Sequence, residues 1–115
     1  MNVRAADDED RQRAILALTN HRYALRERPH KDFARYFGQH SSPEAVVDAL
    51  RRHLTSGGEL EVESREPTAA AQTNMVFRVV FEYRGRAVFS HFYLLPHASI
   101  TNCSVVFASL HPSGR

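Results

Sequence analysis

Residues 75–95, MVFRVVFEYRGRAVFSHFYLL, contain the pattern that decides the fold. Apolar residues alternate with other residues on both sides of Arg84 and Gly85, and a period of two is typical of β-strands. A two-residue loop at Arg84–Gly85 closes a tight hairpin in which Phe77 faces Phe92. The stretch therefore predicts two long antiparallel strands in a fixed register.

Residues that are directly opposed across a strand pair share one face of the sheet, so this register defines two surfaces. Face one is almost wholly apolar and contains Met75, Phe77, Val79, Phe81, Val88, Ser90, Phe92 and Leu94. Face two is mixed and contains Val76, Arg78, Val80, Glu82, Ala87, Phe89, His91, Tyr93 and Leu95. Burial of a large apolar side chain contributes roughly 1.5–3 kcal/mol, so we expect helices to cover face one.

The same alternation continues on both sides of the hairpin. We expect four antiparallel strands in all, at residues 59–65, 74–83, 86–95 and 100–110. If Leu95 faces Ile100 across the second turn, the last strand adds Cys103, Val105 and Phe107 to face one. It then adds Asn102, Ser104 and Val106 to face two.

The first half of the chain predicts three helices. The first spans residues 6–28, with acidic residues in its first turn and arginines in its last, and we expect Pro29 to end it. A shorter helix follows at residues 30–37, with Gly38 as its C-cap.

The third helix lies in SSPEAVVDALRRHL, residues 41–54. It begins either with Ser42 as the N-cap and Pro43 at the first helical position, or with a capping box of Ser41 and Glu44. Three helices followed by an antiparallel meander predict an α+β protein, with the helices on one face of a curved four-stranded sheet.

Length and composition limit the class of protein. A chain of 115 residues is expected to form one domain, residues 1–115. Cys103 is the only cysteine, so neither an internal disulfide nor a thiolate metal site is expected, and a reducing, cytoplasmic setting is predicted. The polar start of the chain is unlike a secretory leader, and no apolar run is long enough for a membrane span. A net charge of +2 does not by itself indicate a nucleic-acid partner.

Three segments together resemble the nuclear-transport-factor-2-like, or SnoaL-type, superfamily: AILALTNHRYAL with DFARYF, then SSPEAVVDALRRHL, then YRGRAVFSHFYLLPHASITNCSVVFASL. The resemblance implies a curved sheet closed by helices into a cone, often with an apolar pocket and with dimers formed through the sheet. The family usually has a strand or hairpin between its second and third helices, and GQHSS leaves no room for one. Catalytic acids of the family's enzymes often lie near that hairpin, so no active site is carried over.

The first functional interpretation is a SnoaL-like module that binds a small apolar ligand or a protein partner and has no clear catalytic machinery. The expected pocket lies under the helices, with polar groups from Tyr23, Tyr36, Tyr83, Ser90 and Cys103. No cofactor is expected, and the seven histidines lack the spacing of a metal site.

Two alternatives stay open, so the sequence does not decide whether the protein is an enzyme. In a small toxin-like ribonuclease of the barnase-like or RelE-like layout, Glu82 and His91 would act as acid and base and Arg78 would bind the phosphate. The simpler interpretation is a solvated ion pair of Arg78 with Glu82, with His91 in an interface. A small inhibitor that binds a macromolecule through face two is the other alternative.

Face two is too apolar to be left in water, because soluble monomers rarely expose a large contiguous apolar patch. We therefore expect a homodimer joined through this surface, with Arg78 of one chain near Glu82 of the other. The predicted interface comprises Val76, Arg78, Val80, Glu82, Phe89, His91, Tyr93, Leu95 and Val106.

Overall fold

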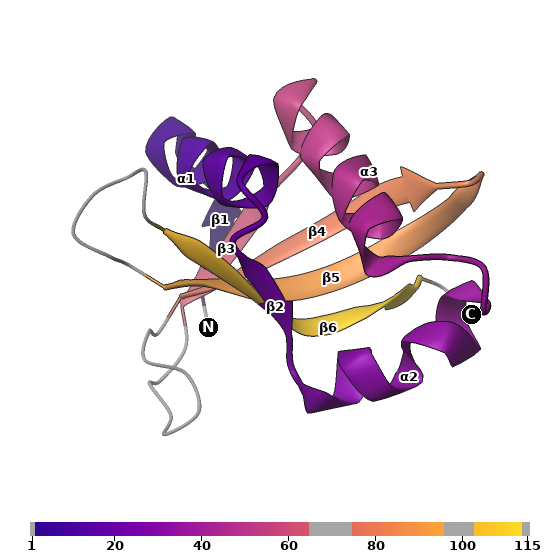
Figure 1. Ribbon diagram of the computed structural model, residues 1–115. Helices are drawn as coiled ribbons and strands as arrows, with labels where there is room; N and C mark the ends of the chain where they lie inside the picture. The colour runs from indigo at the N-terminus through magenta and orange to yellow at the C-terminus, as the bar shows by residue number, and fades with distance from the viewer. Residues whose placement is uncertain (1, 65–74, 96–102, 114–115) are drawn as a thin grey trace.

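The computed structural model describes residues 2–64, 75–95 and 103–113 of the chain (Figure 1). Within these ranges the fold is α+β, as predicted, with three helices and one six-stranded sheet. The elements in chain order are β1 (Asn2–Ala5), α1 (Asp8–Thr19), β2 (Tyr23–Leu25), α2 (Glu27–Phe37), α3 (Pro43–Thr55), β3 (Glu61–Ser64), β4 (Met75–Tyr83), β5 (Arg86–Leu95) and β6 (Ser104–Pro112).

The β4–β5 hairpin has the predicted turn and the predicted register. Arg84 and Gly85 have φ angles of 52° and 77°, and two consecutive positive values are the signature of a type I′ turn. Phe77 is opposed to Phe92 along the ladder, and Arg78 is opposed to His91. The side-chain alternation that follows from this turn is therefore confirmed.

Face one forms the core, as expected. Phe77, Phe92 and Phe107 are each at most 2% exposed, and their rings pack in sequence with centroids 5.3 and 5.9 Å apart. Helices α1 and α3 lie side by side over this face (Figure 1). Their buried side chains complete the core and include Ala14, Ala17, Leu18, Val46, Val47, Leu50 and Leu54.

The predicted caps of two helices are confirmed. The Ser42 hydroxyl accepts a hydrogen bond from the Ala45 amide at 3.2 Å, and Pro43 is the first residue of α3. Gly38 ends α2 with a φ angle of 89°, a conformation that glycine adopts without strain.

The first helix is much shorter than predicted, and the prediction that it spans residues 6–28 is wrong. Helix α1 ends at Thr19, and Tyr23–Leu25 form the edge strand β2, parallel to β6. Pro29 does not end a helix, because it lies in the first turn of α2, where its missing N–H is not needed. Pairing with a strand more than eighty residues later in the chain overrides the local helical pattern.

The expectation that all three helices cover face one is wrong for α2. Helix α2 runs beside β6, in the region beyond the three residues that β2 pairs with (Figure 1). Phe33 reaches the core from this position, and Phe37 packs edge-on against Tyr83 with ring centroids 6.1 Å apart. This helix therefore takes the place of a strand along the second half of β6.

The sheet is mixed and open, with strand order β1-β3-β4-β5-β6-β2, so the expected four-stranded antiparallel sheet closed into a cone is only partly right. The four predicted strands are its antiparallel centre, and β1 and β2 are added at the two edges. The predicted register of β6 is wrong, since Leu95 is opposed to Ser104 and not to Ile100.

An irregularity in β6 changes which side chains face the core. Phe92 is opposed to Phe107 but His91 is opposed to Ser109, so Ala108 is the extra residue of a β-bulge. Because of this bulge, Leu110 points to face one and is only 2% exposed. Strict alternation from Phe107 would have placed Leu110 on face two.

We predict that Phe77→Ala and Phe92→Ala each lower the free energy of unfolding by about 3–5 kcal/mol, because each removes a buried ring and leaves a cavity. Val3→Ala, at a side chain that is 43% exposed on edge strand β1, serves as the control and should have a small effect. Denaturant unfolding measures all three variants. Unfolding of both phenylalanine variants at the wild-type midpoint would show that face one is not the core.

Candidate binding surface

Face two lies on the opposite side of the sheet from α1 and α3 (Figure 1). None of the helices in the described part of the chain lies over β4 and β5 on this side. Val80, near the middle of β4, is 49% exposed. The other apolar residues around it are half-buried: Phe89, Tyr93, Leu95 and Val106. Face two therefore presents partly exposed apolar side chains that are open to contact.

An aromatic row extends from face two to α2. The Phe89 ring lies edge-on to His91 at 4.7 Å and close to His111 at 5.6 Å, measured between ring centroids. His111 in turn lies 5.8 Å from Tyr36, whose ring is capped by the Arg35 guanidinium at 5.0 Å. The row joins β5, β6 and α2 into one surface.

His111 was missed in the sequence because only the bulge at Ala108 places it opposite Phe89. Tyr36 was assigned to a pocket under the helices but packs against His111 at the edge of face two. The sequence did contain one signal of the bulge. Phe107 and Leu110 are both apolar but lie three positions apart, which a regular strand with a period of two would not place on one face.

The ion pair of face two differs from the one expected. Arg78 Nη1 lies 3.7 Å from Glu63 Oε2, so the partner of Arg78 is on β3 and is not Glu82. Glu63 is 2% exposed, and a buried carboxylate needs such a cation to offset its lost hydration. Val76, opposed to Glu63, is also only 2% exposed, whereas Glu82 is exposed.

The three residues of the nuclease hypothesis do not surround a single point. Arg78 and His91 are opposed, but Glu82 lies four positions further along β4. At about 3.4 Å per residue, Glu82 lies about 14 Å further along the strand than Arg78 and the opposed His91. An acid and a base that act on one phosphodiester need to be much closer to it.

The five residues expected in a ligand pocket lie in different places. Ser90 and Cys103 are buried, and the Ser90 hydroxyl donates a hydrogen bond to the Ser109 carbonyl at 2.9 Å. Tyr83 donates to the Ser41 hydroxyl at 3.4 Å and lines grooves near the hairpin turn, while Tyr36 contacts His111. Tyr23 lines a separate groove of about 280 Å³ near the start of α3. The structure does not gather them around one cavity.

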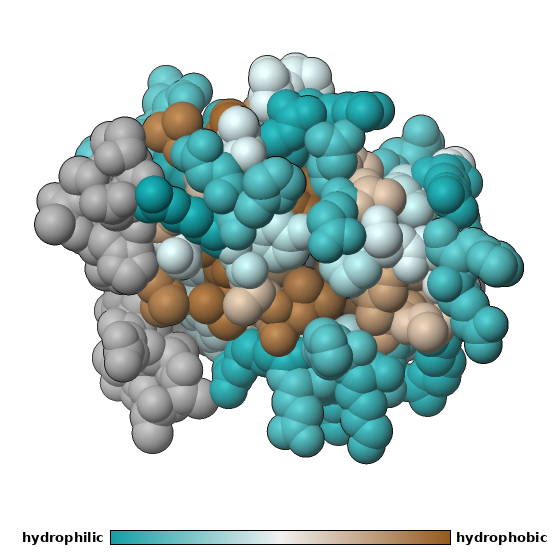
Figure 2. Space-filling model, in the orientation of Figure 1, coloured by the Kyte–Doolittle hydropathy of each residue, from teal (hydrophilic) through white to brown (hydrophobic). Residues whose placement is uncertain are grey.

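A second apolar region lies at the edge of the sheet. Figure 2 shows it as a band between α3 and α2, with polar side chains above and below. Partly buried side chains that pack against the core on this side of the molecule include Tyr23, Leu25 and Phe37. This apolar region is the partly exposed edge of the core that face one forms.

The groove at Tyr23 also contains two groups with altered pKa values. Burial raises the pKa of Tyr23, and the nearby Glu44 carboxylate adds to the shift. The pKa of Asp48 is lowered, first by its hydrogen bond with Arg51 at 2.8 Å and then by the charges of Arg52 and Arg51. At the start of α1, burial raises the pKa of Asp10. These shifts lie away from face two.

Among the described residues there is no group of three or more histidines, cysteines or carboxylates that could hold a metal ion. None of the helices in the described ranges is long and apolar enough to span a bilayer.

Comparison of the chain with protein-family models, curated proteins and solved structures finds no match. The resemblance to the SnoaL-type superfamily therefore stays a prediction.

We predict that the stabilising effect of Asp48 disappears in acid. Its pKa in the folded protein lies below the ordinary value of 3.8, so its contribution is present above that pH and is lost as the pH falls through the folded pKa. Asp48→Asn should therefore be less stable than wild type at neutral pH, with a difference that shrinks below about pH 4. Urea unfolding across this range measures it, with the exposed Glu59→Gln as control. A constant difference at every pH would contradict the ion-pair assignment.

Proposed function

We propose that this protein is a small interaction module that associates with a second copy of itself through face two. The observation that carries the proposal is the half-exposed apolar side of the sheet, centred on Val80 and Phe89, which are opposed across β4 and β5. Helices α1 and α3 are committed to face one and α2 to the edge of β6. A partner that covers face two would remove its apolar side chains from water.

Charge complementarity supports a second copy as the partner. Arg78 and Glu82 lie two positions on either side of Val80. A two-fold axis that passes over Val80 and runs across the strand therefore brings Arg78 of one protomer towards Glu82 of the other. Arg78 can serve two carboxylates, because a guanidinium has five N–H donors and the Arg78 side chain is still 35% exposed beside Glu63. The internal pair with Glu63 would remain in such a dimer.

The aromatic row suits this role better than catalysis. Tyrosine, phenylalanine and histidine bury large areas with little loss of side-chain freedom, and Tyr93 would keep its hydroxyl near the rim. The proposed interface is a revised form of the sequence-based one. It retains Val80, Glu82, Phe89, His91, Tyr93, Leu95 and Val106 with Arg78, adds His111, and omits the buried Val76.

We predict that light scattering at neutral pH and micromolar concentration gives twice the single-chain mass of 13.1 kDa. Phe89→Arg should give a folded monomer, because it places a charge at the centre of the buried surface. Thr55→Arg, an exposed position at the end of α3, adds the same charge away from face two and should stay dimeric. A wild-type particle of single-chain mass, or dissociation by both variants, would exclude association through face two.

A further inference from the structure

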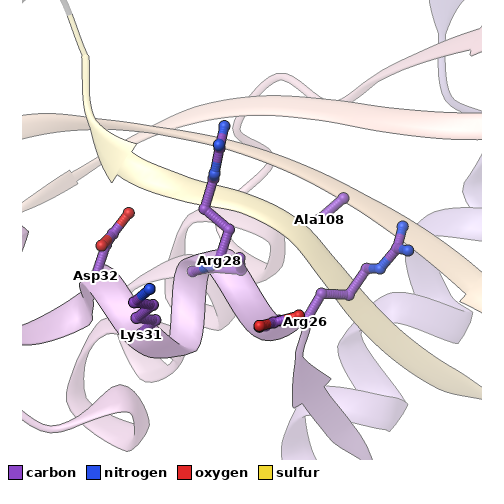
Figure 3. Close-up of a pocket in the computed structure, with 7 residues that line it drawn as sticks. Arg26, Arg28, Lys31, Asp32 and Ala108 are labelled. Atoms are coloured by element: carbon purple, nitrogen blue, oxygen red, sulfur yellow. The ribbon is translucent and has the colours of Figure 1, made fainter.

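A groove of about 530 Å³ lies between the start of α2 and strand β6, at the edge of the sheet. Its lining is mostly charged and comprises Arg26, Glu27, Arg28, Pro29, Lys31, Asp32 and Ala108. Figure 3 shows Arg28 extending across β6 on one side of Ala108. Arg26 extends on the other side of Ala108. Neither the core nor the proposed dimer surface accounts for this groove.

The three cations of the groove have no partner within the described part of the chain. Among the described residues, no hydrogen bond or ion pair involves the side chains of Arg26, Arg28 or Lys31. Most arginines on the helices instead form ion pairs or hydrogen bonds with other residues of the chain. Arg13, for example, pairs with Glu9 at 2.8 Å, and Arg51 and Arg52 both pair with Asp48 at 2.8 Å.

The acidic side chains of the groove do not neutralise it. Asp32 Oδ2 lies 3.3 Å from Arg35 Nη2, so a cation outside the groove already offsets its charge. Among the described residues of the groove, Glu27 then supplies the one negative charge that remains to balance the three cations. The positive end of the α2 dipole lies at the same place and adds to the surplus.

A backbone hydrogen bond fixes the start of α2 relative to the floor of the groove. The Arg26 amide donates a hydrogen bond to the Phe107 carbonyl at 3.0 Å, which ties the start of α2 to β6. The next residue of β6 is Ala108, the extra residue of the bulge. Its small side chain leaves room between the two guanidinium groups, where a longer one would fill the groove.

We propose that this groove binds a compact ligand that carries a diphosphate group. Two guanidinium groups can each bind phosphate oxygens through paired N–H donors, and the Lys31 ammonium adds a third positive charge. A volume of about 530 Å³ is in the range of small-molecule sites. A nucleic-acid strand would need positive side chains along a longer track than this groove offers, so its size favours a compact ligand.

The test is calorimetric titration of the wild-type protein with inorganic pyrophosphate, at low salt and at physiological salt. We expect saturable binding to one site per chain that weakens with salt. Arg26→Gln and Arg28→Gln should each weaken the affinity by about tenfold, because each removes a charge-assisted contact. Both positions are exposed, so neither variant should affect folding.

The matched control is Arg4→Gln, which removes one positive charge from β1 at the opposite edge of the sheet and should leave the affinity unchanged. Ala108→Leu fills the floor without a change of charge and should also weaken binding. Equal weakening by Arg4→Gln would show a diffuse charge effect and overturn the proposal. So would an absence of pyrophosphate binding, or binding of a single-stranded oligouridylate with no measurable affinity for pyrophosphate.

Discussion

The position of the Arg84–Gly85 turn is the constraint on which the rest of the structure depends. Because side chains alternate along a strand, a loop one residue longer or shorter would slip the register by one and place the apolar residues of β4 on the same face as the mixed residues of β5. The observed turn places Phe77 and Phe92 under the helices and leaves Val80 and Phe89 on the other side. One local geometry thus assigns both the core and the exposed surface.

Face two is left open because β2 and α2 both lie along the β6 edge of the sheet. Strand β2 pairs with only three residues of β6, and α2 continues along the same edge. A helix in this position supplies Phe33 to the core but cannot extend the sheet towards closure. Face two therefore stays uncovered by the described helices, and the space between α2 and β6 becomes a groove. The bulge at Ala108 serves both features, since it turns Leu110 into the core and leaves a small residue at the groove.

The sequence was most informative where residues close together in the chain determine the structure. The hairpin register, the Ser42 cap and the core side of the central strands all depend on neighbours or on strict alternation. Strand β2 was missed because Tyr23–Leu25 is too short to show a period and exists only through its pairing with β6. Strand β1 was missed for the same reason, as it pairs with β3 and has little apolar pattern of its own.

The candidate surface was predictable in outline but not in its contacts. Alternation placed Arg78, Phe89 and His91 on one face, and the structure agrees. The pairing of Arg78 with Glu63 could not be found, because it depends on the register between β3 and β4, which no tight-turn motif in the sequence fixes. The contact between His111 and Tyr36 depends in addition on the bulge and on the unexpected position of α2.

The central claim is that the two faces of one sheet have different roles, one in the core and one in association. Hydroxyl-radical footprinting over a range of protein concentrations tests it most directly, because oxidation reports solvent access at single side chains. The account predicts that oxidation of Phe89 and Tyr93 rises as the protein is diluted through its dissociation range. Phe37 and Tyr83, half-buried on the other side, should react at a constant rate. Equal and concentration-independent oxidation of all four residues would contradict the account.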